Sequence, residues 1–108
     1  MQTLIEQFQT FLADTKLNIP KLYETEKEKN PIAYVKFFTP DSSWSWWITE
    51  WDGEDTFFGL VKGHETELGY FSLSELDEVR GPLGLYIEVD LHFPPTPLSQ
   101  IQSEEEGK

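Results

Sequence analysis

The chain contains no cysteine and only two histidines among its 108 residues. The lack of cysteine excludes a disulfide scaffold, a zinc–thiolate site and a thiol nucleophile. A serine–histidine–carboxylate catalytic set would need His64 or His92 as its base, and the sequence has no Gly-x-Ser-x-Gly elbow to hold the serine. We therefore expect a protein without nucleophilic catalysis.

Basic residues are also few: eight lysines and arginines stand against twenty aspartates and glutamates, for a formal net charge of −12. The first forty residues are balanced, whereas residues 41–90 hold twelve acids against only Lys62 and Arg80. A polyanionic domain repels phosphate backbones and membrane surfaces and attracts cationic partners. We therefore expect neither direct binding of nucleic acid nor association with a membrane.

Long apolar runs are absent, and the first fifteen residues form an acidic amphipathic segment that does not resemble a signal peptide. Aromatic residues make up 15% of the chain, which suits a folded core. We expect a cytoplasmic protein with a single domain over residues 1–102 and a disordered acidic tail over residues 103–108.

The spacing of apolar residues predicts the secondary structure. Thr3 and Glu6 fit a capping box that begins a helix extending to about Asp14, and Ser72 and Glu75 repeat the pattern for a short second helix. Aromatic and β-branched runs between turn residues predict four strands, over residues 32–39, 44–51, 56–63 and 66–71.

Residues 86–93 alternate between apolar and polar and predict a fifth strand, whose buried face would carry Ile87, Val89, Leu91 and Phe93. The expected fold class is therefore α+β. It combines a curved antiparallel sheet of about five strands with an N-terminal helix and a short helix after the fourth strand.

Four tryptophans lie in the predicted strand 44–51. Strict alternation puts Trp44 and Trp46 on one face, with Trp47 and Trp51 on the other. Because both faces are then aromatic, one set of rings must contact something other than the main core: the N-terminal helix, a loop or a partner.

Four blocks of the chain resemble a known family: YVKFFTPDS, GEDTFFGLV, ELGYFSL and RGPLGL. They are similar to blocks of the bacterial family catalogued as domain of unknown function 2958, and the resemblance covers the run from Lys36 to Leu98. It implies a small intracellular bacterial protein, often encoded on plasmids, integrative elements and phages. It implies no catalytic residues.

Acidic residues gather at the predicted hairpins and on the short helix. We expect a partner-binding surface made of Asp52, Glu54, Asp55, Glu65, Glu67, Glu75, Asp77 and Glu78, with Trp46 or Trp47 as an apolar anchor. Acidity that serves only solubility is the ordinary explanation, and charge alone slightly favours it. The mobile-element setting implied by the resemblance favours recognition instead, by analogy with small acidic proteins of such elements.

Our first hypothesis is therefore a non-enzymatic acidic interaction protein, a monomer or homodimer without a cofactor, that binds a basic nucleic-acid-binding protein. Its most specific form is a DNA mimic, because closely spaced carboxylates imitate the charge density of a phosphate backbone. The target would be a host defence protein of the restriction or CRISPR type.

Two alternatives stay open. One is a small-molecule-binding or sequestering protein with an aromatic-lined pocket at Trp44, Trp46 or Tyr86. The weaker one is a metal-dependent hydrolase around Glu88, Asp90 and His92, which share one face of the predicted fifth strand. Residues two apart on a strand lie roughly 6–7 Å from each other, so these three would need a second element to close around one ion.

Overall fold

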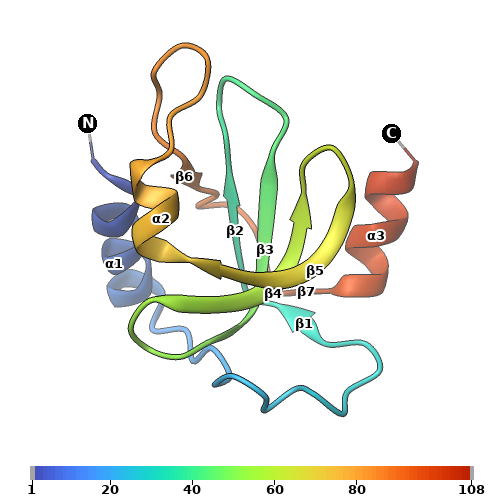
Figure 1. Ribbon diagram of the computed structural model, residues 1–108. Helices are drawn as coiled ribbons and strands as arrows, with labels where there is room; N and C mark the ends of the chain where they lie inside the picture. Colours follow the sequence, from blue (N-terminus) through green and yellow to red (C-terminus); the bar gives the residue numbers. More distant parts are fainter. Residues whose placement is uncertain (1, 108) are drawn as a thin grey trace.

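The computed structural model describes residues 2–107, which form an open antiparallel sheet with helices on both of its faces (Figure 1). The five strands lie in the order β5-β4-β3-β2-β6. Their bounds are β2 Val35–Phe38, β3 Ser45–Trp51, β4 Thr56–Lys62, β5 Thr66–Ser72 and β6 Glu88–Val89.

A separate two-stranded ladder pairs β1 (Ile32–Ala33) with β7 (Thr96–Pro97). The helices are α1 Leu4–Thr15, α2 Leu73–Glu78 and α3 Leu98–Glu106. This arrangement confirms the predicted α+β class. Within residues 2–107, none of the helices has both the length and the apolar character needed to cross a membrane.

Helix α1 begins where the sequence predicts. The Thr3 hydroxyl accepts the N–H of Glu6 at 3.2 Å, and the Glu6 carboxylate accepts the N–H of Thr3 at 3.0 Å. This reciprocal capping box satisfies two N–H groups that the first helical turn leaves without partners. The buried face of the helix carries Leu4, Phe8 and Phe11.

The main core lies between the sheet and helices α1 and α2. Phe8 is at its centre, with its ring edge-on to Phe37, Trp51 and Phe57 at centroid distances of 5.5, 5.0 and 5.4 Å. Edge-to-face pairs at such distances stabilise a core beyond the area that they bury. Leu73 and Leu76 add the apolar side of α2 to the same cluster.

A β-bulge interrupts β3 and corrects the predicted alternation. Ile48 pairs with Gly59 and Glu50 with Phe58, so Thr49 is the extra residue, and its hydroxyl donates to the Phe58 carbonyl at 3.0 Å. A one-residue shift reverses the face of every side chain that follows it. The prediction that Trp51 shares a face with Trp47 is therefore wrong.

The opposite face of the sheet is covered by α3, at the right of Figure 1. Leu98 and Ile101 lie one turn apart on this helix and pack on Trp47, Leu60 and Ala33. Trp47 thus contacts the C-terminal helix rather than the N-terminal helix, a loop or a partner, which are the three contacts that the sequence predicts for this face. Disorder is predicted from residue 103, but residues 103–106 belong to α3, so the prediction is wrong for these four residues. Met1 and Lys108 lie outside the described residues.

The predicted fifth strand is much shorter than expected. Only Glu88 and Val89 pair with β2, and the side chain of Asp90 then accepts the N–H of His92 at 2.9 Å. This local turn leads the chain away from the sheet, so Leu91 is 67% exposed although the alternation predicts that it is buried. Ile87 and Val89 are buried as predicted.

Candidate functional site

The eight carboxylates of the predicted partner-binding surface fall into two groups at opposite ends of β4 (Figure 1). Seven residues of strand separate the two ends by roughly 20 Å. Glu65 and Glu67 lie at the β4–β5 end. The other six lie around the β3–β4 turn and on α2: Asp52, Glu54, Asp55, Glu75, Asp77 and Glu78. The structure therefore brings six of the eight together.

Two aspartates of the larger group hold the β3–β4 turn in place. One oxygen of Asp52 accepts three backbone N–H groups, from Glu54, Asp55 and Thr56, at 2.8–3.0 Å. The carboxylate of Asp55 accepts the Ser72 hydroxyl at 2.6 Å and the Ser74 N–H at 2.8 Å. The turn is thereby fixed to the start of α2.

The same hydrogen bonds keep both carboxylates charged. The Glu54 N–H is the strongest influence that lowers the pKa of Asp52, and the Ser72 hydroxyl is the strongest that lowers the pKa of Asp55. Asp77 also serves the fold, because its carboxylate accepts the N–H of Ile5 in the first turn of α1 at 3.0 Å.

The remaining five carboxylates are exposed to solvent: Glu54, Glu65, Glu67, Glu75 and Glu78. Among residues 2–107, the one ion pair joins Lys62 to Glu105 at 2.8 Å, so none of these five is neutralised by a lysine or arginine. Their negative potential therefore extends into solvent from the β3–β4 turn, from the β4–β5 end of the sheet and from α2.

The predicted apolar anchors are not available to a partner. Trp46 is 6% exposed in the main core, and Trp47 is 2% exposed beneath α3. Burial of large aromatic rings stabilises the sheet on both faces. The prediction that Trp46 or Trp47 is an apolar anchor for a partner is therefore wrong, because neither ring is accessible to one.

A cleft that the sequence pattern did not single out lies beside β5, on the face of the sheet that carries α3. Its volume is about 500 Å³. Helix α3 covers Trp47 and Leu60 but leaves the β5 side of this face open. Segment 23–31 forms one wall, Leu68 and Tyr70 of β5 another, and α3 a third.

Glu50 is the key residue of this cleft. Its side chain is 3% exposed, and its two oxygens accept the N–H groups of Tyr23 and Thr25, each at 2.8 Å, as well as the Thr25 hydroxyl. Tyr23 has φ of 72°, a left-handed conformation that is rare for an aromatic residue. The buried carboxylate thus holds the first wall of the cleft against the sheet.

Aromatic side chains and carboxylates share the cleft. Tyr70 packs on Phe58 at a centroid distance of 4.9 Å and lies 6.5 Å from the ring of Tyr23. Hydrogen bonding to the Tyr23 side chain raises the pKa of the Tyr70 hydroxyl above 10.0, and desolvation and the negative charges of Glu50 and Glu26 act in the same direction. The cleft is therefore both aromatic and electronegative.

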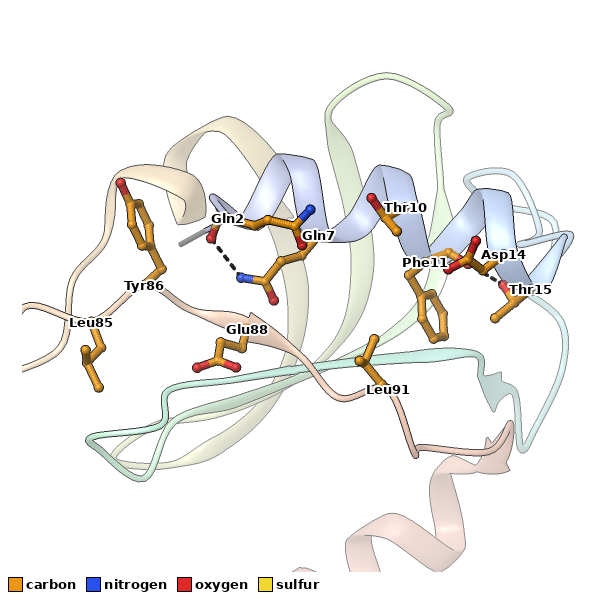
Figure 2. Close-up of a pocket in the computed structure, with 10 residues that line it drawn as sticks. All are labelled: Gln2, Gln7, Thr10, Phe11, Asp14, Thr15, Leu85, Tyr86, Glu88 and Leu91. Carbon is orange, nitrogen blue, oxygen red and sulfur yellow. Dashed lines mark hydrogen bonds between the residues drawn. The ribbon is translucent and has the colours of Figure 1, made fainter.

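The residues of the small-molecule alternative do not share one cavity. Tyr86 lines a groove of about 530 Å³ between α1 and residues 85–91, shown in Figure 2. On its α1 side, the side-chain oxygen Oε1 of Gln7 accepts the N–H of Val89 at 3.0 Å, and the side-chain Nε2 of Gln7 donates to the backbone carbonyl of Gln2 at 3.1 Å. Trp44 lines two shallower hollows elsewhere, and Trp46 is buried.

The residues of the hydrolase alternative do not share a strand face, because β6 ends at Val89. Asp90 is engaged by the N–H of His92 in the turn that follows. Across residues 2–107, no group of three or more histidine, aspartate and glutamate side chains is placed to hold a metal ion. The geometry that this alternative needs is therefore not found in the described part of the chain.

Comparison with family models matches residues 4–105 to a family described as "Protein of unknown function (DUF2958)". Searches of curated proteins and of solved structures found no match. The family match extends from the first turn of α1 almost to the end of α3, so it includes the β3–β4 and β4–β5 turns, α2 and every wall of the cleft.

Proposed function

We propose that this chain, which belongs to the DUF2958 family of proteins of unknown function, is a non-enzymatic acidic interaction protein that binds a basic nucleic-acid-binding protein. One observation carries the proposal: five exposed carboxylates, none paired with a lysine or arginine among residues 2–107, lie in the β3–β4 turn, at the β4–β5 end of the sheet and on α2. Such a surface steers a cationic partner toward it and repels anionic ones.

The way in which the carboxylates are held supports this proposal. Asp52 and Asp55 fix the β3–β4 turn and the start of α2, and Glu54 and Glu75 project from these fixed segments. Charges on a rigid backbone lose little conformational freedom when a partner binds. The acidic surface is therefore pre-organised.

DNA mimicry is the specific form of binding that we propose. The two groups of carboxylates lie roughly 20 Å apart along β4, so they would occupy two places along a basic groove that normally follows a phosphate backbone. A protein with this role acts in the cytoplasm as an inhibitor of a defence protein of the restriction or CRISPR type. The mobile-element setting implied by the family resemblance supports this by analogy.

The proposal is tested by capture from a host lysate on the immobilised protein at about 50 mM and about 500 mM salt, because screening weakens surface electrostatics steeply over this range. We expect a basic nucleic-acid-binding protein to be captured at low salt only and to be released by short duplex DNA. A captured set that is indifferent to salt and to DNA would contradict the proposal.

A further inference from the structure

We infer that the cleft beside β5 binds the guanidinium group of an arginine side chain, presented by an extended segment of the partner that pairs with the free edge of β5. The inference rests on the proposed function, since it takes the partner to be cationic. It adds the place of binding, the chemical group that is recognised and the conformation of the segment that carries this group.

Strand β5 ends the described sheet and offers an edge for pairing. It pairs with β4 over its whole length in a continuous register, from Thr66 opposite Lys62 to Ser72 opposite Thr56. An edge strand presents unpaired N–H and C=O groups to which an extended peptide can add. Proline and lysine, which commonly block such edges, are absent from this strand, and its one charged residue is Glu67.

The register of β5 directs a paired segment toward the cleft. Leu68 and Tyr70 lie opposite Leu60 and Phe58 on the α3 face, and both are more than half exposed. Alternate side chains of a strand point to the same face. Every second side chain of a segment that adds to β5 would therefore point into the cleft.

The cleft suits a guanidinium group better than a neutral or negative one. The rings of Tyr23, Phe58 and Tyr70 supply faces for cation–π contact, and carboxylates of Glu26, Glu28 and Glu50 line the same space against a single lysine, Lys29. Arginine is favoured over lysine because its planar group stacks on aromatic rings and still donates to carboxylates.

The fold already uses this contact within the chain. The guanidinium carbon of Arg80 lies 3.6 Å from the centroid of the Tyr86 ring, while its Nη1 donates to the carbonyls of Asp77 and Val79. An arginine that stacks on a tyrosine and donates to nearby oxygens is the arrangement that we infer for the cleft.

A second copy of this chain is a poor occupant. Each copy carries a formal charge of −12, and pairing of two β5 edges would bring two Glu67 side chains and two electronegative clefts close together. Like charges that face each other across paired strands are destabilising. Charge complementarity therefore selects a basic segment from a different protein.

The probe for the test is an end-capped nine-residue peptide of alternating threonine and arginine. Its control contains citrulline, which has the shape of arginine without the charge, at every arginine position. Binding is measured at low salt by calorimetry, and its location by amide chemical shifts of the isotope-labelled protein. We expect shifts centred on Leu68, Tyr70 and Tyr23, with affinity at least tenfold higher for the arginine peptide.

Two variants separate the cleft from the rest of the surface. Tyr70→Ser should weaken binding of the arginine peptide at least tenfold and leave the fold intact, because the side chain is 56% exposed. Leu83→Ser is the matched control: it removes an exposed apolar side chain from the loop before β6, outside the cleft, and should not change the affinity. Circular dichroism verifies the fold of both variants.

The remaining outcomes each overturn a defined claim. Shifts confined to Glu54, Glu75 and Glu78 would overturn this inference and leave the proposed function standing. Equal affinity of the citrulline peptide would overturn recognition of the guanidinium group. Binding of free arginine amide as tight as that of the peptide would overturn pairing with β5. Absence of binding anywhere on the protein would overturn both the inference and the proposed function.

Discussion

The buried carboxylate of Glu50 accepts the backbone N–H of Tyr23 at 2.8 Å, across 27 residues of sequence. This hydrogen bond joins three features of the fold. The bulge at Thr49 sets the face on which Glu50 lies, Glu50 fixes the left-handed Tyr23, and Tyr23 forms part of the cleft wall. Bulges commonly re-aim side chains near functional sites.

Replacement of Glu50 should therefore destabilise the protein and loosen this wall. Glu50→Ala leaves the N–H groups of Tyr23 and Thr25 without their acceptor in a part-buried setting. We expect a loss of about 2–4 kcal/mol in the free energy of unfolding, measured in urea. Amide hydrogen exchange at Tyr23 and Thr25 should accelerate more than exchange in α1.

The control for this prediction is Glu28→Ala, which removes an exposed carboxylate from the same cleft. It should change the free energy of unfolding by less than about 0.5 kcal/mol. Equal stability of the Glu50→Ala and Glu28→Ala proteins would show that Glu50 does not anchor the loop.

Asp52 should make stability depend on pH in the acid range. Its pKa is lowered from 3.8 in the folded state, chiefly by the Glu54 N–H, so its contribution is complete above the unfolded pKa and is lost as pH falls through the folded pKa. Asp52→Asn should lower stability near neutral pH by no more than about 1 kcal/mol, because water screens an exposed carboxylate. The deficit should shrink below about pH 4.

Urea unfolding at several pH values measures this difference. Glu54→Gln is the matched control. It removes one negative charge from the same turn but leaves in place the Asp52 oxygen that accepts the three N–H groups. A deficit of Asp52→Asn that stays constant down to pH 2–3 would mean that the charge of Asp52 does not stabilise the turn.

The C-terminal helix should be needed for stability. Ile101 is buried on Trp47 and Leu60, so Ile101→Ala should lower the free energy of unfolding by about 2–4 kcal/mol through lost burial and the cavity that remains. Gln100→Ala, at the exposed neighbouring position, should have little effect. Similar stability of the two variants would show that α3 does not cover this face of the sheet.

Local features of the fold could be predicted from sequence. The capping box of Thr3 and Glu6 needs only a spacing of three residues, and both hydrogen bonds form. The Ser72 hydroxyl likewise accepts the N–H of Glu75 at the start of α2. Signals of this kind depend on neighbours within one helical turn, so tertiary context changes them little.

Features that depend on distant residues could not be predicted in the same way. The bulge at Thr49 comes from pairing with β4, and without it strict alternation puts Trp51 on the wrong face. The sequence pattern predicts no helix at the C-terminus, because the contact of Leu98 and Ile101 with Trp47 and Leu60 is made by residues far apart in the chain. Leu91 is exposed because the turn at Asp90 ends the strand early.

The candidate site was predictable only in its charge. Composition identified the acidic hairpins, but it could not separate Asp52 and Asp55, which hold the turn, from the exposed Glu54. The cleft could not be predicted, because its walls come from segments far apart in the chain. One available signal was Glu50, an acidic residue inside an aromatic strand.

The most direct test of the account compares two charge-reversed proteins for affinity to the captured partner. Glu54→Lys with Glu78→Lys changes the acidic surface, whereas Asp14→Lys with Glu106→Lys makes the same change in net charge outside it. We predict that the first pair lowers affinity at least tenfold at low salt and reduces its dependence on salt, while the second has a much smaller effect. Equal affinities of the two proteins would contradict recognition through the β3–β4 turn and α2.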